Sequence, residues 1–210
     1  MVNRRKILYL ITKSVPGGAG KYTYDLATQA ARVHDVTVAA GGHDALAIRL
    51  TDAEVPYIEI RGLGRDITFT NDIRAFFHIL HVLFRLRPDV LHVSSPKAAG
   101  LGGLAFFIYR FCFLRFNAKS VYTVHGWVFS EPRSRAQQKL LRAASRIICL
   151  FYDEIIVLSR RELETALEYT IAPQRKLNLI HNGLNPQTFV LLDREAAREK
   201  LFGRELNDAV

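Results

Sequence analysis

The chain has 210 residues, of which 49% are hydrophobic and 23% are charged, with a net charge of +9. This composition is typical of a globular protein with a sizeable core, and it excludes disordered, fibrous and low-complexity chains. The excess of basic residues predicts an anionic partner, which could be a nucleic acid, an acidic membrane surface or a phosphorylated substrate.

Two segments imitate targeting or membrane sequences, but both are short. The apolar run after the basic start, Ile7 to Ile11, has five residues, whereas a signal peptide needs about 7 to 15. The longest uncharged stretch, Ala98 to Tyr109, has twelve residues and is too short to span a bilayer. Cys112 and Cys149 lie in apolar runs and are interpreted as buried, reduced side chains, so we expect a cytoplasmic protein.

Short runs rich in Val and Ile alternate with segments of helical period, which is the pattern of βαβ units around a parallel sheet. The fold class is therefore predicted to be α/β, with a Rossmann-like parallel sheet flanked by helices. The expected strands are Lys6–Thr12, Asp35–Ala40, Tyr57–Ile60, Val90–Val93, Ser120–Val124, Glu154–Leu158 and Leu177–Ile180. The expected helices are Gly20–Val33, Thr70–Leu86, Ala98–Phe116, Ser134–Phe151 and Arg160–Tyr169.

In the second of these helices, six apolar residues have the spacing of one buried face. They are Ile73, Phe76, Phe77, Leu80, Leu83 and Phe84. After the last strand the pattern changes to a turn-rich loop and a short charged helix. We therefore expect a domain over residues 1–183 and the start of an interdomain linker over residues 184–210.

The first strand leads into "SVPGGAGKYTYDLA", a glycine-rich turn that opens a helix. The free N–H groups of a helix start, with Gly17 and Gly18 allowing close approach, can bind a phosphate or diphosphate. The segment is neither a P-loop nor a G-x-G-x-x-G fingerprint, because Val15, Tyr22 and Thr23 occupy positions that those motifs reserve for other residues. The alternative is a tight turn without a ligand.

Two further strands end in polar residues at the carboxyl edge of the sheet, where open α/β sheets bind ligands. "DVLHVSSPK" places Ser94, Ser95 and Lys97 there as candidate substrate-binding residues, although Ser95 could instead cap the next helix. "VYTVHGWVF" places His125 there, where it could donate a hydrogen bond, move a proton or cap the strand end. Trp127 is interpreted as a core side chain, with a platform for a sugar ring as the alternative.

From Arg74 to Lys119 the sequence has seven basic residues and one acidic residue, Asp89, interleaved with Phe, Leu and Ile. Basic residues mixed with bulky apolar residues on helices suit an anionic membrane surface better than a nucleic-acid groove. We therefore expect a membrane partner and no nucleic acid. The sequence also lacks the G-x-S-x-G, C-x-x-C and H-E-x-x-H motifs, so we expect neither a catalytic triad nor a metal.

Several segments, taken in order, resemble the N-terminal, acceptor-side domain of GT-B glycosyltransferases of family 4. They are "KILYLIT", "PGGAGKYTYDLA", "HDVTVAAGG", "VPYIEI", "RPDVLHVSSPKAAGLGG", "VYTVHGWVF", "YDEIIVLSRRELE" and "LNLIHNGLNPQTF". The resemblance implies retaining transfer of a sugar from a nucleotide-sugar to a lipid-linked saccharide or polysaccharide intermediate. It also implies no cofactor and a peripheral location at the inner face of the cell membrane.

The resemblance further implies roles for single residues. Gly17 and Gly18 would face the donor diphosphate, and His125 would contact the transferred sugar while Gly126 keeps the backbone close to it. The pair Asn182-Gly183, with Phe189 following, would lead into the link between domains.

The domain that binds most of the nucleotide in this family has no counterpart in these residues. We therefore expect the isolated chain to be inactive, or to need a separate donor-binding chain. The alternative is a non-catalytic domain that binds a membrane or a partner subunit.

Overall fold

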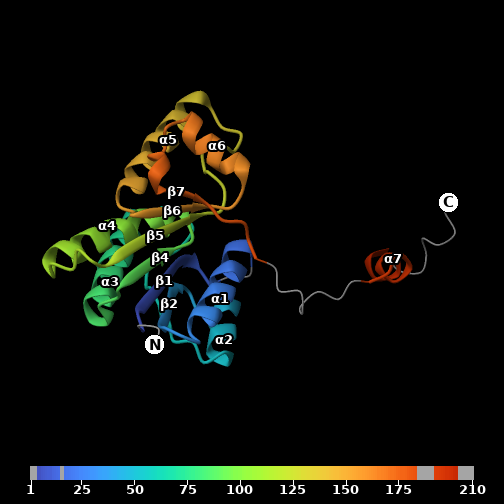
Figure 1. Cartoon of the computed structure of the whole chain (residues 1–210), viewed down its shortest axis with the longest axis horizontal. Coiled ribbons are helices and arrows are strands. Elements are labelled where there is room, and N and C mark those ends of the chain that lie inside the picture. The colour runs from blue at the N-terminus through green and yellow to red at the C-terminus, as the bar shows by residue number, and fades with distance from the viewer. Residues whose placement is uncertain (1–3, 15–16, 184–191, 203–210) are drawn as a thin grey trace.

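The computed structural model describes residues 4–14, 17–183 and 192–202, which contain a seven-stranded, entirely parallel sheet with helices on both faces (Figure 1). Its strands are β1 (Lys6–Lys13), β2 (Asp35–Gly41), β3 (Tyr57–Glu59), β4 (Val90–Val93), β5 (Lys119–Val124), β6 (Glu154–Val157) and β7 (Leu177–Leu179). Its α-helices are α1 (Gly18–Ala30), α2 (Ala45–Asp52), α3 (Phe69–Leu86), α4 (Pro96–Cys112), α5 (Arg135–Leu150), α6 (Arg160–Glu168) and α7 (Arg194–Phe202). A short 3₁₀ helix, η1 (Gln174–Lys176), precedes β7.

The strand order is β3-β2-β1-β4-β5-β6-β7. The chain builds outward from β1 to β3, returns through α3, and then builds outward in the other direction from β4 to β7. The neighbours β1 and β4 therefore form the switch point of the sheet, and open α/β sheets bind their ligands outside the carboxyl ends of such strands. This arrangement confirms the predicted fold class.

The side chains of β1 alternate between two cores, because successive residues of a strand point to opposite faces. Leu8 and Leu10 pack with residues of α3, α4 and α5 in the larger core. Tyr9 and Ile11 pack on the other face with residues of α1 and α2, such as Ala27. Figure 1 shows the same division, with α1 and α2 together on one side and α3 and α4 together on the other.

Several predictions differ from the structure. Helix α2 was not predicted, because its eight residues bury only Leu46, Ala47 and Leu50. Helix α4 was expected to continue to residue 116. It ends at Cys112 because Leu114 adopts a left-handed conformation, with φ of 51°, and the chain turns there. Cys149 is buried as expected, but Cys112 is exposed.

The buried face of α3 agrees in part with the predicted one. Leu83 is buried, and Phe76, Leu80 and Phe84 are partly buried against the core, whereas Ile73 and Phe77 are exposed. The prediction weighted large side chains and so missed the small Ala75, which belongs to the larger core. Within the described ranges, no helix is both long and apolar enough to cross a membrane.

Candidate functional site

The predicted site residues lie at the carboxyl edge of the central strands. Ser94 follows β4 and His125 follows β5, and these strands are neighbours in register. Strand β1 pairs with β4 on its other side and leads, through the glycine turn, into α1. The switch point therefore brings together the start of α1 and the ends of β4 and β5.

A hydrogen-bonded network that the sequence analysis missed holds these elements together. Nε2 of His92, on β4, lies 2.8 Å from Oγ1 of Thr123, on β5. The hydroxyl of Tyr22, on α1, lies 3.2 Å from the same Thr123 oxygen. Residues 92 and 123 are polar positions inside apolar strands, which is the signal that could have identified them.

His125 packs against this network. The ring of Tyr22 stands edge-on to the imidazole, with 5.0 Å between the two ring centroids and an interplanar angle of 77°. Nε2 of His125 is buried and has no hydrogen-bond partner among the described residues. Because buried polar atoms are normally paired, this nitrogen is free to bond to a substrate group.

Both histidines are neutral at neutral pH. Burial lowers the pKa of His125 below its usual value. Burial, together with the neighbouring His125, lowers the pKa of His92 to about 4. A neutral imidazole has one donor and one acceptor nitrogen, so His125 can orient a sugar hydroxyl but is not held as a proton-donating imidazolium.

Gly126 leaves the space beside His125 open. Its φ is +104°, a conformation that residues with a side chain rarely adopt, and a Cβ added there would meet no atom within 4 Å. Local geometry therefore requires glycine here, and the same glycine exposes the backbone at the edge.

Gly17 and Gly18 leave the start of α1 equally open. A Cβ added at either position would meet nothing within 4 Å, and the φ of 162° at Gly17 is extended. The first turn of α1 has no side-chain cap and no acidic residue. Its free N–H groups and the positive end of the helix dipole can therefore accept an anion.

Two buried hydroxyls near these elements also lack partners within the described part of the chain. They are Oγ of Ser94, which is 1% exposed, and Oγ1 of Thr23, which is completely buried. Ser94 was predicted from its place after β4. Thr23 was noticed only as a mismatch to a dinucleotide motif.

Ser95 has a structural role. Its Oγ accepts a hydrogen bond from the N–H of Thr12 at 2.9 Å and lies 2.7 Å from Oγ1 of Thr12. Ser95 occupies the N-cap position of α4 but makes no capping bond with its side chain. Oγ1 of Thr12 instead accepts a hydrogen bond from the N–H of Ala98.

Lys97 also differs from the expectation that it faces a substrate. Its ammonium lies 2.6 Å from a carboxylate oxygen of Asp72, on α3, and the two side chains are only 15% and 18% exposed. It also donates to the carbonyl of Asp66. A substrate would have to compete with this ion pair.

The remaining predicted residues lie beside the site. Trp127 is 5% exposed, and its Nε1 donates to the carbonyl of Glu162, which confirms its interpretation as a core residue. Asn182 and Gly183 are exposed at the end of the described segment that follows β7. Phe189 lies outside the described residues. In the described ranges, no group of three acidic, histidine or cysteine residues could hold a metal ion.

Comparison with known proteins connects this geometry to one family. A model described as "Glycosyltransferase Family 4" matches residues 16–188. A curated relative from Escherichia coli, UDP-Gal:alpha-D-GlcNAc-diphosphoundecaprenol alpha-1,3-galactosyltransferase, is 22% identical over 149 residues. That match covers 70% of this chain and 37% of the relative.

Solved structures share the fold. A glycosyltransferase from Rickettsia africae is 20% identical with a TM-score of 0.67, and the match covers 94% of this chain and 49% of the other. The Anabaena protein HepE, solved with UDP-glucose, is 18% identical with a TM-score of 0.65, and the match covers 87% of this chain and 45% of HepE. The chain thus spans half or less of the length of these relatives.

Proposed function

Because the chain belongs to glycosyltransferase family 4, we propose that it is the acceptor-side domain of a retaining enzyme. The donor is a nucleotide-sugar, and the acceptor is a lipid-linked saccharide or a polysaccharide intermediate. The E. coli relative, whose name specifies UDP-Gal and a diphosphoundecaprenol-linked sugar, supports this choice of substrates. The observation that carries the proposal is His125, with an unpaired Nε2 beside the open backbone of Gly126 at the switch point.

In the proposed reaction, the acceptor oxygen attacks the anomeric carbon on the face from which the nucleotide diphosphate leaves. The new carbon–oxygen bond forms as the bond to the diphosphate breaks, and the acceptor proton passes to the leaving phosphate oxygen. His125, neutral because of its lowered pKa, hydrogen-bonds to the transferred sugar and orients it. The open start of α1 at Gly17 and Gly18 faces the diphosphate. No metal takes part in this scheme.

The domain assignment follows from the same proposal. Residues 1–183 form the acceptor-side domain, and residues 184–210 begin the link to a donor-binding half. That half would be supplied by a further segment or by a separate chain. The chain would act in the cytoplasm, at the inner face of the membrane.

The experiment measures binding and transfer separately. We expect the 210-residue chain to bind a soluble N-acetylglucosamine diphosphate with a short prenyl tail, measured by calorimetry. Replacing His125 with Ala should leave that binding unchanged, because His125 contacts the transferred sugar and not the acceptor. It should slow sugar transfer about tenfold once a donor-binding half is added, the equivalent of one hydrogen bond of about 1.4 kcal/mol. Ile48→Ser, on the exposed surface of α2, is the matched control and should bind like the wild type.

Transfer of radiolabelled sugar from UDP-galactose or UDP-glucose is expected only when a donor-binding half is added. Turnover by the isolated chain would contradict the assignment of half an active site. Equal rates of transfer by the wild type and His125→Ala, each combined with a donor-binding half, would contradict the role of His125. A second candidate function, a non-catalytic domain that binds a membrane surface or a partner subunit, is favoured by the exposed large apolar side chains of α4 and α5. It would be supported if the acceptor binds but no donor half restores transfer.

A further inference from the structure

The outer sides of α4 and α5 expose an unusual group of large apolar side chains. We call this group the α4–α5 face, and it consists of Leu104, Phe107, Phe111, Phe113, Leu114, Phe116, Leu140, Ile147 and Leu150, each between 37% and 74% exposed. The two helices contact each other, and the ring centroids of Phe107, on α4, and Phe151, at the end of α5, are 6.1 Å apart. A hollow of about 220 Å³ is lined by Phe107, Phe111 and Phe116 from one side and Leu150 from the other. The face is therefore shared by the two helices.

Helix α5 carries large apolar residues on two sides. It buries Ser145 and Cys149 and packs Leu141 and Ile148 against the core. Its exposed side also carries Leu140, Ile147 and Leu150, spaced three or seven residues apart. A surface helix normally turns its polar side to water, and large exposed apolar groups mark contact sites. Something apolar is therefore expected to cover this face.

The charges around the face select the kind of partner. From Val90 to Tyr152 there are nine basic residues, Lys97, Arg110, Arg115, Lys119, Arg133, Arg135, Lys139, Arg142 and Arg146, and one acidic residue, Glu131. Four of the nine form ion pairs: Lys97 with Asp72, Arg110 with Asp153, Arg115 with Asp89 and Arg133 with Glu131. Lys119, Arg135 and Lys139 are exposed and form no ion pair with any residue that the structure describes. A second copy of the chain would bring the same positive charge to the contact. An anionic bilayer instead accepts apolar side chains between its lipids and basic side chains among its head groups.

We propose that the α4–α5 face docks on an anionic lipid bilayer. The proposal deepens the proposed function, since it rests on an acceptor held in a membrane. Both helices begin at the edge that carries the site: α4 follows β4, and α5 follows the loop after His125. Leu140 lies about 8 Å along α5 from its first residue, whereas Phe111 and Leu150 lie at the far ends of the two helices. Docking of the whole face would therefore lay both helices along the bilayer surface, with the site at their near ends.

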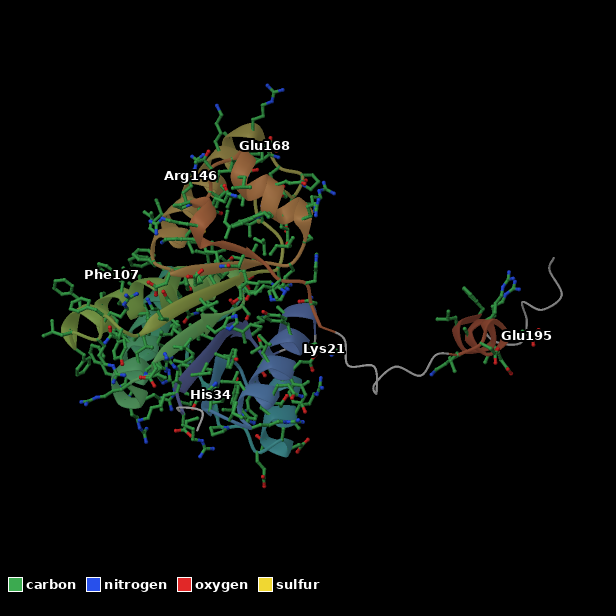
Figure 2. All side chains as sticks on the ribbon, viewed as in Figure 1. Lys21, His34, Phe107, Arg146, Glu168 and Glu195 are labelled. Carbon is green, nitrogen blue, oxygen red and sulfur yellow. The ribbon has the colours of Figure 1, made fainter. Side chains whose placement is uncertain are left out.

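Figure 2 agrees with this orientation. Phe107 and Arg146 lie on one side of the molecule, and Lys21, on the first turns of α1, lies on the opposite side. Helix α1, which follows the glycine turn, therefore stays clear of the docked face. A donor-binding half could approach the site without displacing the membrane.

Cys112 provides a natural probe of this face. It is exposed at the end of α4, whereas Cys149 is buried and burial raises the pKa of its thiol to about 12. A fluorophore that responds to polarity can therefore be attached selectively to Cys112 at pH 7. We expect its emission to rise and shift to the blue with vesicles of phosphatidylcholine and phosphatidylglycerol, and to change little with phosphatidylcholine alone. The same label in Cys112→Ser/Ile48→Cys reports from exposed α2 and should not respond.

Two sets of variants test the apolar and the basic parts separately by vesicle co-sedimentation. Phe111→Ser/Leu150→Ser should reduce binding to anionic vesicles at least tenfold, while Ile48→Ser keeps it. Lys119→Gln and Lys139→Gln should each weaken binding about fivefold, and high salt should do the same. Circular dichroism checks that each variant is folded, and the charge variants keep the test valid if the apolar pair does not fold.

Four outcomes would overturn the proposal. They are an equal response of the label at positions 48 and 112, equal binding to neutral and anionic vesicles, wild-type binding by Phe111→Ser/Leu150→Ser, and a dimer in sedimentation velocity that the same variant abolishes. None of these readouts uses acceptor binding or sugar transfer. A chain that docks on vesicles but binds no acceptor would contradict the proposed function and leave the docking surface intact.

Discussion

At the residue scale, His125 is positioned by aromatic and polar neighbours that belong to other elements. Tyr22 contacts its ring and shares the hydroxyl of Thr123 with His92. Because His92 is 8% exposed and its pKa is lowered to about 4, the imidazole beneath the site stays uncharged. Protonating it would place a charge on a buried side chain.

The lowered pKa of His92 predicts a pH dependence of stability. The unfolded chain takes up this proton near pH 6.5, whereas the folded chain takes it up only near pH 4, so the unfolded chain binds more protons between these values. The contribution of His92 to the free energy of unfolding is therefore fully present above about pH 6.5 and is lost as the pH falls toward 4. We expect His92 to account for a loss of about 2 kcal/mol between pH 7.5 and pH 5.

Urea unfolding of the wild type and His92→Gln at both pH values measures this contribution. The loss between the two pH values should be about 2 kcal/mol smaller in His92→Gln. Thr123→Val is the control, since it removes the hydrogen bond but leaves the buried imidazole, and burial is the larger cause of the lowered pKa. An identical pH dependence in the wild type and His92→Gln would contradict the prediction.

Gly126 and Gly18 make a matched pair for a second prediction. Both have open space at the Cβ position, but only Gly126 has a positive φ. Gly126→Ala should destabilise the fold by about 1–3 kcal/mol through backbone strain alone. Gly18→Ala, in the first turn of α1, should be neutral or stabilising by up to about 1 kcal/mol. Urea midpoints measure both effects, and equal effects at the two positions would refute the role assigned to backbone conformation.

At the element scale, one ion pair joins the first turns of α3 and α4. Asp72 lies in the first turn of α3, where a negative charge is favoured, and Lys97 lies in the first turn of α4, where a positive charge is not. The mostly buried pair offsets this unfavourable position of the lysine. This explains why Lys97 faces α3 rather than the substrate edge.

Removing either member of the pair should destabilise the protein by about 1–3 kcal/mol, because the other charge is left without a partner. Lys97→Met keeps the aliphatic stem, and Asp72→Asn keeps the shape. The double variant should lose at least about 1 kcal/mol less than the sum of the single variants. The prediction would be wrong if the losses of unfolding free energy were strictly additive and Lys97→Met alone lost acceptor binding. That result would indicate that Lys97 contacts the substrate.

The elements that sequence could predict are those with a strong periodic signal. The Val- and Ile-rich strands were found within one or two residues, because their burial on both faces leaves a continuous apolar run. Helix α2 lacks such a signal, since its buried positions span little more than one turn. The face of α3 depends on its contact with α4, which is set by tertiary packing.

The candidate site divides in the same way. His125, Ser94 and the two glycines could be located, because they directly follow strands and their positions need only the rule that ligands bind at the carboxyl edge. Tyr22, His92 and Thr123 could not, because their network joins positions 31 to 101 residues apart. Only the register of β4 and β5 and the packing of α1 bring them together.

At the scale of the whole molecule, polar function and surface charge lie in different places. The neutral histidines and open glycines gather at the carboxyl edge, whereas the exposed Lys119 begins β5 at the opposite edge and the exposed Lys139 lies on α5. If the α4–α5 face docks on a bilayer as proposed, the net charge of +9 serves the orientation of the chain on that surface more than the chemistry of the site. This separation lets membrane binding and acceptor binding be measured independently.

The domain boundary at residue 183 gives the last prediction. Helix α7 has no buried residue, so a chain that ends at Gly183 should unfold with the free energy and denaturant dependence of the full chain.

Ending the chain at Lys176 instead removes β7, whose Leu177 and Leu179 pack against the larger core. That variant should lose about 2 kcal/mol or more and expose the edge of β6 to aggregation. Urea unfolding followed through Trp127, which is buried in the core, measures both variants. If the chain ending at Gly183 were also destabilised, residues 184–210 would belong to the folded domain and not to a linker.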